Sequence, residues 1–260
     1  MLKRNFISIG LLSVFVVFAF ANPVVAQQSN KLADVRRSTE AERATEAANV
    51  LTQIMNIPEN AIPDELMGRA YGIAVIPNVV KGALGFGGQW GKGLMSQRRE
   101  DGSWSPPAYI EIGGGSFGLQ IGVQATDVVL VFTNADGIKG LLKGKIKLGA
   151  DASATAGPVG RKAEVGTDVL LRSGIFAYSR SRGLFAGVSL DGSVVGMDGR
   201  ANQKVYGKEV TGEQILLAKG VASNATVEPF LNALQKASPP NVHEKKVTQE
   251  KQLRTTGTSE

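Results

Sequence analysis

The 260-residue sequence contains no cysteine, only one histidine and few aromatic residues, which make up 6% of the chain. Without cysteine no disulfide can form in any compartment, so packing and hydrogen bonds must stabilise the fold. The histidine, His243, lies near the C-terminus next to charged residues, so a Ser–His–Asp arrangement is excluded. Zinc and iron sites built on His or Cys are excluded for the same reason. We therefore expect no cofactor, no metal and no enzymatic activity.

Motifs for other chemistry are incomplete. The glycines of residues 113–118 satisfy GxGxxG, but a strand-like run follows them where a dinucleotide site needs a helix. Residues 140–145 are one position short of a P-loop, and the Asp-Gly pairs at 191 and 198 are typical of turns rather than of a calcium loop. No pair of carboxylates stands out, although a hydrolase built on carboxylates alone stays open.

Residues 1–26 have the composition of a secretory signal peptide. Lys3 and Arg4 precede an apolar run over residues 6–20, and a small-residue cleavage site ends at Ala26. The run is about 15 residues long, shorter than the roughly 20 that span a bilayer, so we expect cleavage rather than a retained anchor. Removal of the leader lowers the formal charge from +6 to +4, which leaves a mildly basic chain that is attracted weakly to anionic surfaces.

An amphipathic helix is predicted over residues 31–56, within a helical lead at 27–57. Its apolar residues, spaced alternately by three and four, form one stripe: Ala41, Ala44, Ala48, Leu51 and Met55. Because alanine buries little area, we expect the first half to be exposed unless a partner covers it. We expect the helix to pack on its own domain. A membrane-binding or coiled-coil helix is the alternative, although Glu40, Glu42 and Glu46 give it no basic face.

From Gly72 onward the apolar pattern is that of strands, interrupted by glycine and proline. The predicted strands cover residues 73–76, 83–95, 108–112, 117–123, 127–132, 145–150, 164–170, 174–179 and 184–190. Short helices are expected at 63–70, 134–142, 211–219 and 226–237. The tail at 238–260 lacks an apolar stripe, and we expect it to be disordered.

Glycine is over-represented, with 32 residues, or about 12% against the about 7% of ordinary domains. Many glycines lie inside strand-like runs, where they permit bulges, bends and close backbone approach. We therefore predict an α+β fold, with a glycine-rich, mainly antiparallel β core, barrel-like or sandwich-like, wrapped by N- and C-terminal helices. The C-terminus does not end in a strand, which disfavours an outer-membrane barrel.

Basic residues gather in two groups that are candidates for binding lipid headgroups. They are Lys139, Lys143, Lys145 and Lys147, and Arg180 with Arg182. A polybasic segment near an anionic bilayer gains about 1 kcal/mol per residue, and arginine can bind phosphate with two hydrogen bonds. A solvated basic face is the alternative. Trp90 and Trp104 are candidate membrane-interface residues, with burial in the core as the alternative. We expect no nucleic-acid partner, because the chain is exported and poor in aromatics.

Several sequence blocks occur in one order along the chain. They are YGIAVIPNVVKG (71–82), GFGGQWGKG (85–93), DGSW (101–104), PAYIEIGGGSFGLQIG (107–122), VVLVFTNADGIKGLLKG (128–144), YSRSRGLFAGVSLDGS (178–193) and Tyr206-Gly207. In these blocks the chain resembles the SYLF family of lipid-binding domains, which places the domain at residues 58–237. The resemblance implies a β-rich core wrapped by helices and binding of phospholipids. Eukaryotic members bind phosphoinositides, and some bind actin.

These observations together predict a non-enzymatic protein that binds anionic phospholipid, phosphoinositide-like or other, at the cell envelope. An exported chain would meet phospholipid in the periplasm or at the periphery of the outer membrane, where we do not expect actin as a partner. The alternative is an envelope scaffold that binds a protein partner through its N-terminal helix and binds no lipid.

Overall fold

The computed structural model describes residues 39–84, 86–116, 122–163, 166, 174–181, 184–188 and 190–238. The predicted leader, residues 27–38 of the predicted helical lead, nearly all of the strand expected at 164–170, most of the strand expected at 117–123 and nearly all of the expected C-terminal tail lie outside these residues.

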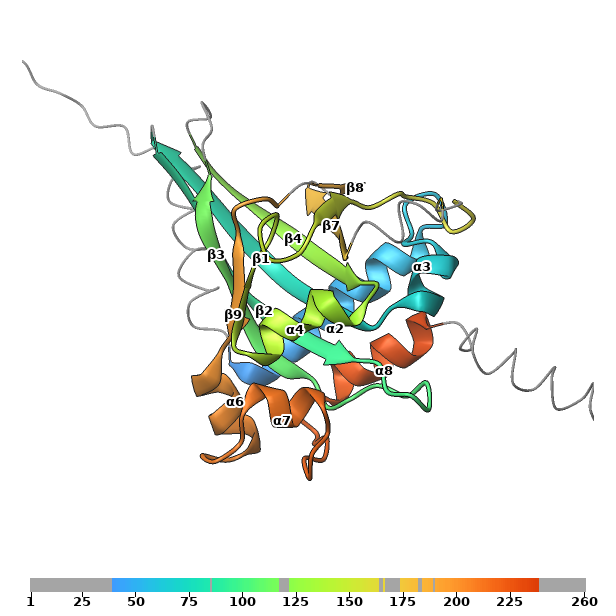
Figure 1. The fold of residues 1–260 in the computed structure, drawn as a ribbon. Coiled ribbons are helices and arrows are strands. Elements are labelled where there is room, and N and C mark those ends of the chain that lie inside the picture. Colours follow the sequence, from blue (N-terminus) through green and yellow to red (C-terminus); the bar gives the residue numbers. More distant parts are fainter. Residues whose placement is uncertain are drawn as a thin grey trace, which may run out of the picture.

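One curled sheet forms the centre of the fold (Figure 1). Its strands are β1 (Gly72–Leu84), β2 (Phe86–Gln97), β3 (Ala108–Ser116), β4 (Gly122–Phe132), β5 (Lys145–Lys147), β6 (Ala154–Ala156), β7 (Ile175–Ser181), β8 (Leu184–Gly187) and β9 (Val194–Met197). Their order is β5-β9-β3-β2-β1-β4-β7-β6, and β8 pairs with β7. The β6–β7 pair is parallel and the other pairs are antiparallel, so the predicted α+β fold with a mainly antiparallel core is confirmed.

Helices cover the sheet on both faces. They are α2 (Glu40–Asn56), α3 (Asp64–Arg69), α4 (Ala135–Leu142), α6 (Gly199–Tyr206), α7 (Gly212–Leu216) and α8 (Glu228–Ala237). On what we call the outer face, α2, α3 and α8 pack over one apolar core. On the inner face, within the curl, α4 and α7 pack over a second core. The two edge strands of the sheet are β5 and β6. Leu148, which follows β5, forms a β-bridge with Ala152, which precedes β6.

Helix α2 packs on its own domain, as predicted. Thr39 and Glu42 form a capping box that fixes its start. The predicted stripe is buried from Ala44 onward, whereas Ala41 is exposed. The expectation of an exposed first half is therefore wrong beyond Ala41. Small alanine side chains let the helix approach the sheet and α8 closely, and Ala44 and Ala47 are fully buried.

The prediction of a single strand at 83–95 is wrong, because this segment contains the end of β1 and most of β2, which pair as one long hairpin. The sequence pattern continues without a break because glycine and apolar residues surround the turn. A bulge interrupts β1 between Ile76 and Val79, where Asn78 has a positive φ of 51°. The bulge brings β1 so close to β2 that a Cβ at Gly93 would lie 2.1 Å from the carbonyl oxygen of Val75. Only glycine fits there.

Three short elements were not predicted from the sequence. These are β6, β9 and α6, each of eight residues or fewer. Asp191-Gly192 forms the expected turn, with Gly192 at φ 82°. Asp198-Gly199 does not form the expected turn. Instead, the Asp198 carboxylate accepts a hydrogen bond from the Ala201 backbone N–H and caps α6.

Candidate functional site

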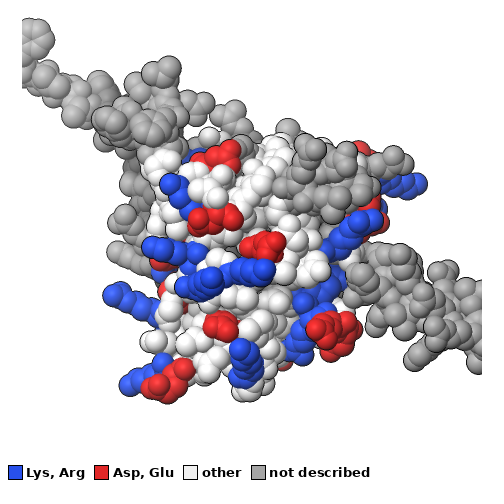
Figure 2. All heavy atoms as spheres, in the orientation of Figure 1, with Lys and Arg blue, Asp and Glu red and all other residues white. Residues whose placement is uncertain are grey.

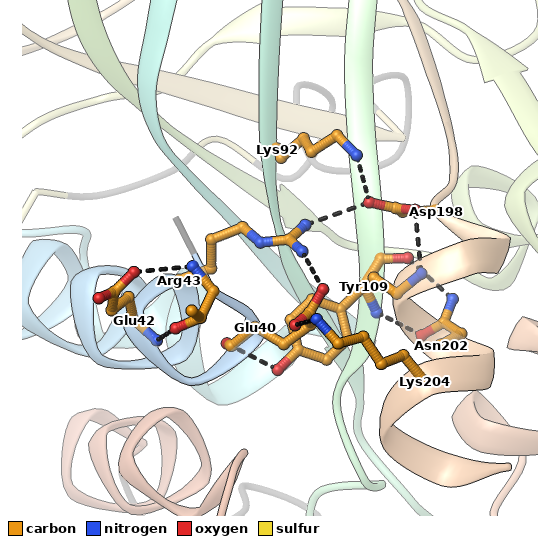
Figure 3. Close-up of polar contacts among 10 residues, drawn as sticks. Glu40, Glu42, Arg43, Lys92, Tyr109, Asp198, Asn202 and Lys204 are labelled. Atoms are coloured by element: carbon orange, nitrogen blue, oxygen red, sulfur yellow. Dashed lines mark hydrogen bonds and ion pairs between the residues drawn. The ribbon is translucent and has the colours of Figure 1, made fainter. Parts of the chain in front are cut away.

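A buried charge cluster joins α2 to the sheet and to α6 (Figure 3). One carboxylate oxygen of Asp198 accepts hydrogen bonds from Arg43 at 3.1 Å and from Lys92 at 2.7 Å. The Arg43 and Asp198 side chains are each 6% exposed. Burial opposes ionisation of Asp198, but the bonds from Lys92, the Ala201 backbone and Arg43 outweigh it and lower its pKa. The cations and the carboxylate compensate one another, which indicates a structural role.

A second layer of contacts extends this cluster to the start of α2 (Figure 3). Glu40 pairs with Arg43 at 3.1 Å and with Lys204 of α6 at 2.6 Å. The hydroxyl of Tyr109 donates to the Glu40 carbonyl, and the Asn202 side chain bonds both the backbone N–H and the carbonyl of Tyr109. Sequence patterns gave no sign of this network, because its members come from segments far apart in the chain.

Arg180, a predicted headgroup residue, is engaged inside the protein. Its guanidinium pairs with Asp127 on the neighbouring strand β4 at 2.5 Å. The other oxygen of Asp127 accepts from the backbone N–H of Asn78 at the bulge of β1. Arg180 thus compensates a carboxylate that is itself 9% exposed. Arg182, its predicted companion, lies outside the described residues.

The predicted lysine group is brought together on α4, on β5 and in the turn between them. Lys139, Lys143, Lys145 and Lys147 are all exposed. Lys139 pairs with Asp136 at 2.5 Å, whereas the other three make no ion pair within the described part of the chain. Lys145 and Lys147 flank Ile146, which points into the inner core, so both lysines lie on the outer face.

Trp90 lies on the same outer face. The next residue, Gly91, faces the inner core, since a Cβ there would contact Val79 and Ile76. The strand register places Trp90 in one row across the sheet, which we call the outer row. In order from β5 to β4, the outer row is Lys147, Val194, Gly113, Trp90, Val80 and Ala125. Val194, Trp90, Val80 and Ala125 are half-buried.

Trp104, the second predicted interface residue, is 4% exposed. Its indole N–H donates to the Ser238 hydroxyl at 3.0 Å, and the Arg98 guanidinium lies 4.7 Å from its ring centre. This placement matches the alternative of burial in the core, so Trp104 takes no part in the surface described below.

Acidic side chains limit the basic surface. Figure 2 shows acidic side chains among the basic ones on the face in view, without one continuous positive area. On the outer face, Glu111 of β3 pairs in register with Lys92 of β2. On its other side Glu111 pairs with Gly196 of β9, which in turn pairs with Lys145 of β5. Within the described residues no group of three or more His, Cys, Asp or Glu side chains could hold a metal ion. None of the described helices is both long and apolar enough to cross a bilayer.

Comparison with known proteins identifies the family. The model of the Ysc84 family, described as "Las17-binding protein actin regulator", matches residues 113–237. LAS seventeen-binding protein 3 of Saccharomyces cerevisiae is 36% identical over 180 residues, which cover 68% of this chain and 39% of that protein. The chain belongs to the SYLF (Ysc84) family.

Relatives in animals show the same similarity. SH3 domain-containing YSC84-like protein 1 of Homo sapiens is 32% identical over 181 residues, covering 68% of this chain and 53% of that protein. The chain thus spans about two fifths to about half of the length of these SYLF relatives. The description of the family and the name of the yeast relative refer to binding and regulation rather than to a reaction.

Proposed function

We propose that this SYLF protein binds anionic phospholipid surfaces through the outer row and the adjoining lysines. The observation that carries the proposal is the strand register, which aligns Trp90 with Lys147 on one face. Three strand-to-strand steps separate the two residues, or roughly 14 Å at the usual strand spacing. Small and apolar residues fill the row between them.

Each part of this surface suits a bilayer interface. Tryptophan places an apolar ring among acyl chains and a polar N–H at the headgroups. Lysines near an anionic surface contribute about 1 kcal/mol each, an attraction that salt weakens. Lys143, Lys145 and Lys147 are exposed and make no internal ion pair among the described residues, so their charge is available to phosphate.

The alternative, a scaffold acting through its N-terminal helix, is less well supported. From Ala44 onward that helix buries its apolar stripe in its own domain, so this part of the stripe is not open to a partner. The proposed site of action is the cell envelope, in line with the leader predicted at residues 1–26. The anionic headgroup need not be a phosphoinositide, because the basic side chains of this surface are lysines, which act as point charges on any phosphate.

Flotation with vesicles tests the proposal. The double variant Lys145→Gln/Lys147→Gln should bind vesicles of phosphatidylglycerol and phosphatidylcholine about 30-fold more weakly than wild type, from a loss of about 2 kcal/mol. The matched control is Lys208→Gln/Lys236→Gln, which removes the same charge from exposed lysines elsewhere. We expect the control to change affinity by less than about threefold, since distant charges are screened. Equal losses in both variants, or none in the first, would contradict the proposal.

A further inference from the structure

The inner face of the sheet changes from apolar to polar toward the turn of the long β1–β2 hairpin. Val79 of β1 belongs to the inner core, and Lys81, two residues further on, points to the same side. Lys81 pairs in register with Gln89 of β2 and with Gln124 of β4. Gln89, Lys81 and Gln124 form what we call the inner row, one layer beyond the core.

Lys81 is a half-buried cation without a compensating anion. No carboxylate among the described residues makes an ion pair with it. Burial lowers the pKa of Lys81. Every other cation described here that is at least as buried as Lys81 has a carboxylate, carbonyl or aromatic ring as a partner, as Arg43 and Arg98 show.

Two further polar groups face the same region. Thr126 is diagonal to Lys81 on the neighbouring strand, at about 7–8 Å by the usual sheet geometry. Its hydroxyl is buried and has no hydrogen-bond partner in the described structure, and the residue is 6% exposed. On the other side of Lys81, the buried Gln89 amide donates to the Ser193 hydroxyl. A buried hydroxyl without a partner is costly unless a ligand or water completes its bonding.

We propose that the inner row is an anion-binding site in which the Lys81 ammonium binds a phosphate or carboxylate group, with Thr126 and Gln89 beside it. A ligand of this class supplies the negative charge that Lys81 lacks and an acceptor for the Thr126 hydroxyl. The anion is either the headgroup of a membrane lipid or a free phosphate compound, since the chemistry that Lys81 recognises is the same.

This site is separate from the surface proposed above. Lys81 and Trp90 lie on opposite faces of the sheet, so the inner row does not depend on the outer row. Loss of one site can therefore be measured while the other is intact.

Amine modification of Lys81 tests the inference. The wild-type protein is treated with a limited amount of an acetylating reagent, and acetylation of each lysine is measured by mass spectrometry. The probes are glycerol 3-phosphate, sodium chloride of equal ionic strength, and vesicles of phosphatidylglycerol and phosphatidylcholine. At a probe concentration of roughly four times Kd, acetylation of Lys81 should fall about fivefold. Lys208, which is exposed, makes no ion pair among the described residues and lies outside the proposed lipid-binding surface, serves as the internal control and should not be protected to the same degree.

The variant Lys81→Gln completes the test. Removing an uncompensated half-buried charge should leave Tm unchanged or raise it, whereas it should abolish any rise in Tm that glycerol 3-phosphate gives to wild type. Protection by glycerol 3-phosphate supports a site for soluble phosphate, and protection by anionic vesicles alone supports a lipid headgroup. The inference is overturned if neither probe protects Lys81, if Lys208 is protected equally, or if Lys81→Gln lowers Tm as a structural lysine would.

If Lys81→Gln retains full flotation while Lys145→Gln/Lys147→Gln loses it, and no probe protects Lys81, the outer surface stands and the inner row fails. If Lys145→Gln/Lys147→Gln retains full flotation while a probe protects Lys81 in the wild-type protein, the inner row stands and the outer surface fails.

Discussion

Two sets of cations in this SYLF domain differ in what surrounds them. Arg43, Lys92 and Arg180 are wholly or partly buried, and each contacts a carboxylate. Lys81, Lys145 and Lys147 have no carboxylate partner among the described residues, and Lys81 is half-buried as well. Removing the carboxylate from a buried ion pair is costly because it leaves an uncompensated charge, whereas the charge of a half-buried cation without a carboxylate partner is available to an external anion. The comparison separates structural charges from candidate binding charges.

Among the cations that have a carboxylate partner, the substitution expected to lower stability most is Asp198→Asn. Asparagine keeps an acceptor for the α6 cap but leaves Arg43 and Lys92 without their shared carboxylate. We expect a loss of about 3 to 4 kcal/mol, seen as a fall in Tm of about 10 °C in thermal denaturation. The control is Asp136→Asn, which breaks the exposed pair with Lys139 and should cost less than about 0.5 kcal/mol.

The same variant has a pH signature. Because the folded protein lowers the pKa of Asp198 below its ordinary value of 3.8, the stabilisation is present above that value and is lost as pH falls through the folded pKa. The difference in Tm between wild type and Asp198→Asn should therefore persist from neutral pH down to the ordinary pKa and narrow only in stronger acid. A difference that closes near neutral pH would show that the carboxylate is not responsible.

Arg180→Gln tests which set Arg180 belongs to. Loss of its charged hydrogen bonds to Asp127 should cost about 1.5 to 2 kcal/mol, because Asp127 is left buried near Glu46 without its cation. Affinity for anionic vesicles should stay within about twofold of wild type, as a paired internal cation contributes little to the surface. A large loss of flotation with unchanged Tm would instead place Arg180 at the headgroups, as the sequence predicted.

The smallest expected effect is at Glu46, a half-buried carboxylate near Asp127. Burial, and then the charges of Glu42 and Asp127, raise its pKa. Ionised Glu46 therefore destabilises the fold as pH rises through the raised pKa. Glu46→Gln should be more stable than wild type at neutral pH by less than about 1 kcal/mol, with no difference below the ordinary value of 4.5. Thermal melts across this range provide the test, and Glu42→Ala, which removes the side chain that accepts from the Thr39 backbone N–H in the capping box, should be less stable than wild type.

The sequence predicted the general architecture because helix periodicity and glycine-rich alternation are local signals. The helices α3, α4, α7 and α8 lie within three residues of their predicted bounds, and α2 ends at Asn56 as predicted, while residues 31–38 of its predicted range lie outside the described residues. Short elements such as β9 and α6 carry too few residues to show a period. The predicted lysines come from one short stretch of the chain, and the structure places Lys145 and Lys147 on the outer face, whereas α4, which carries Lys139, packs on the inner face.

The two candidate binding surfaces could not be predicted from local pattern. Strict alternation along β1 would put Lys81 on the outer face with Ile73 and Val75. The bulge at Asn78 shifts the alternation, so Val79 and Lys81 face inward instead. Likewise, Trp90 and Lys147 are brought into one row only by pairing across β3 and β9. The cluster around Asp198 combines residues 155 and 106 positions apart, a distance that no window along the sequence covers.

Fluorescence of Trp90 tests the proposed lipid-binding surface most directly. The variant Trp104→Phe leaves Trp90 as the sole tryptophan of the chain. On addition of vesicles containing phosphatidylglycerol, its emission should shift to shorter wavelength, and brominated phosphatidylglycerol should quench it, with both effects lost at high salt. If the protein floats with these vesicles while the Trp90 emission keeps its position and is not quenched, the outer row is not the surface that meets the membrane.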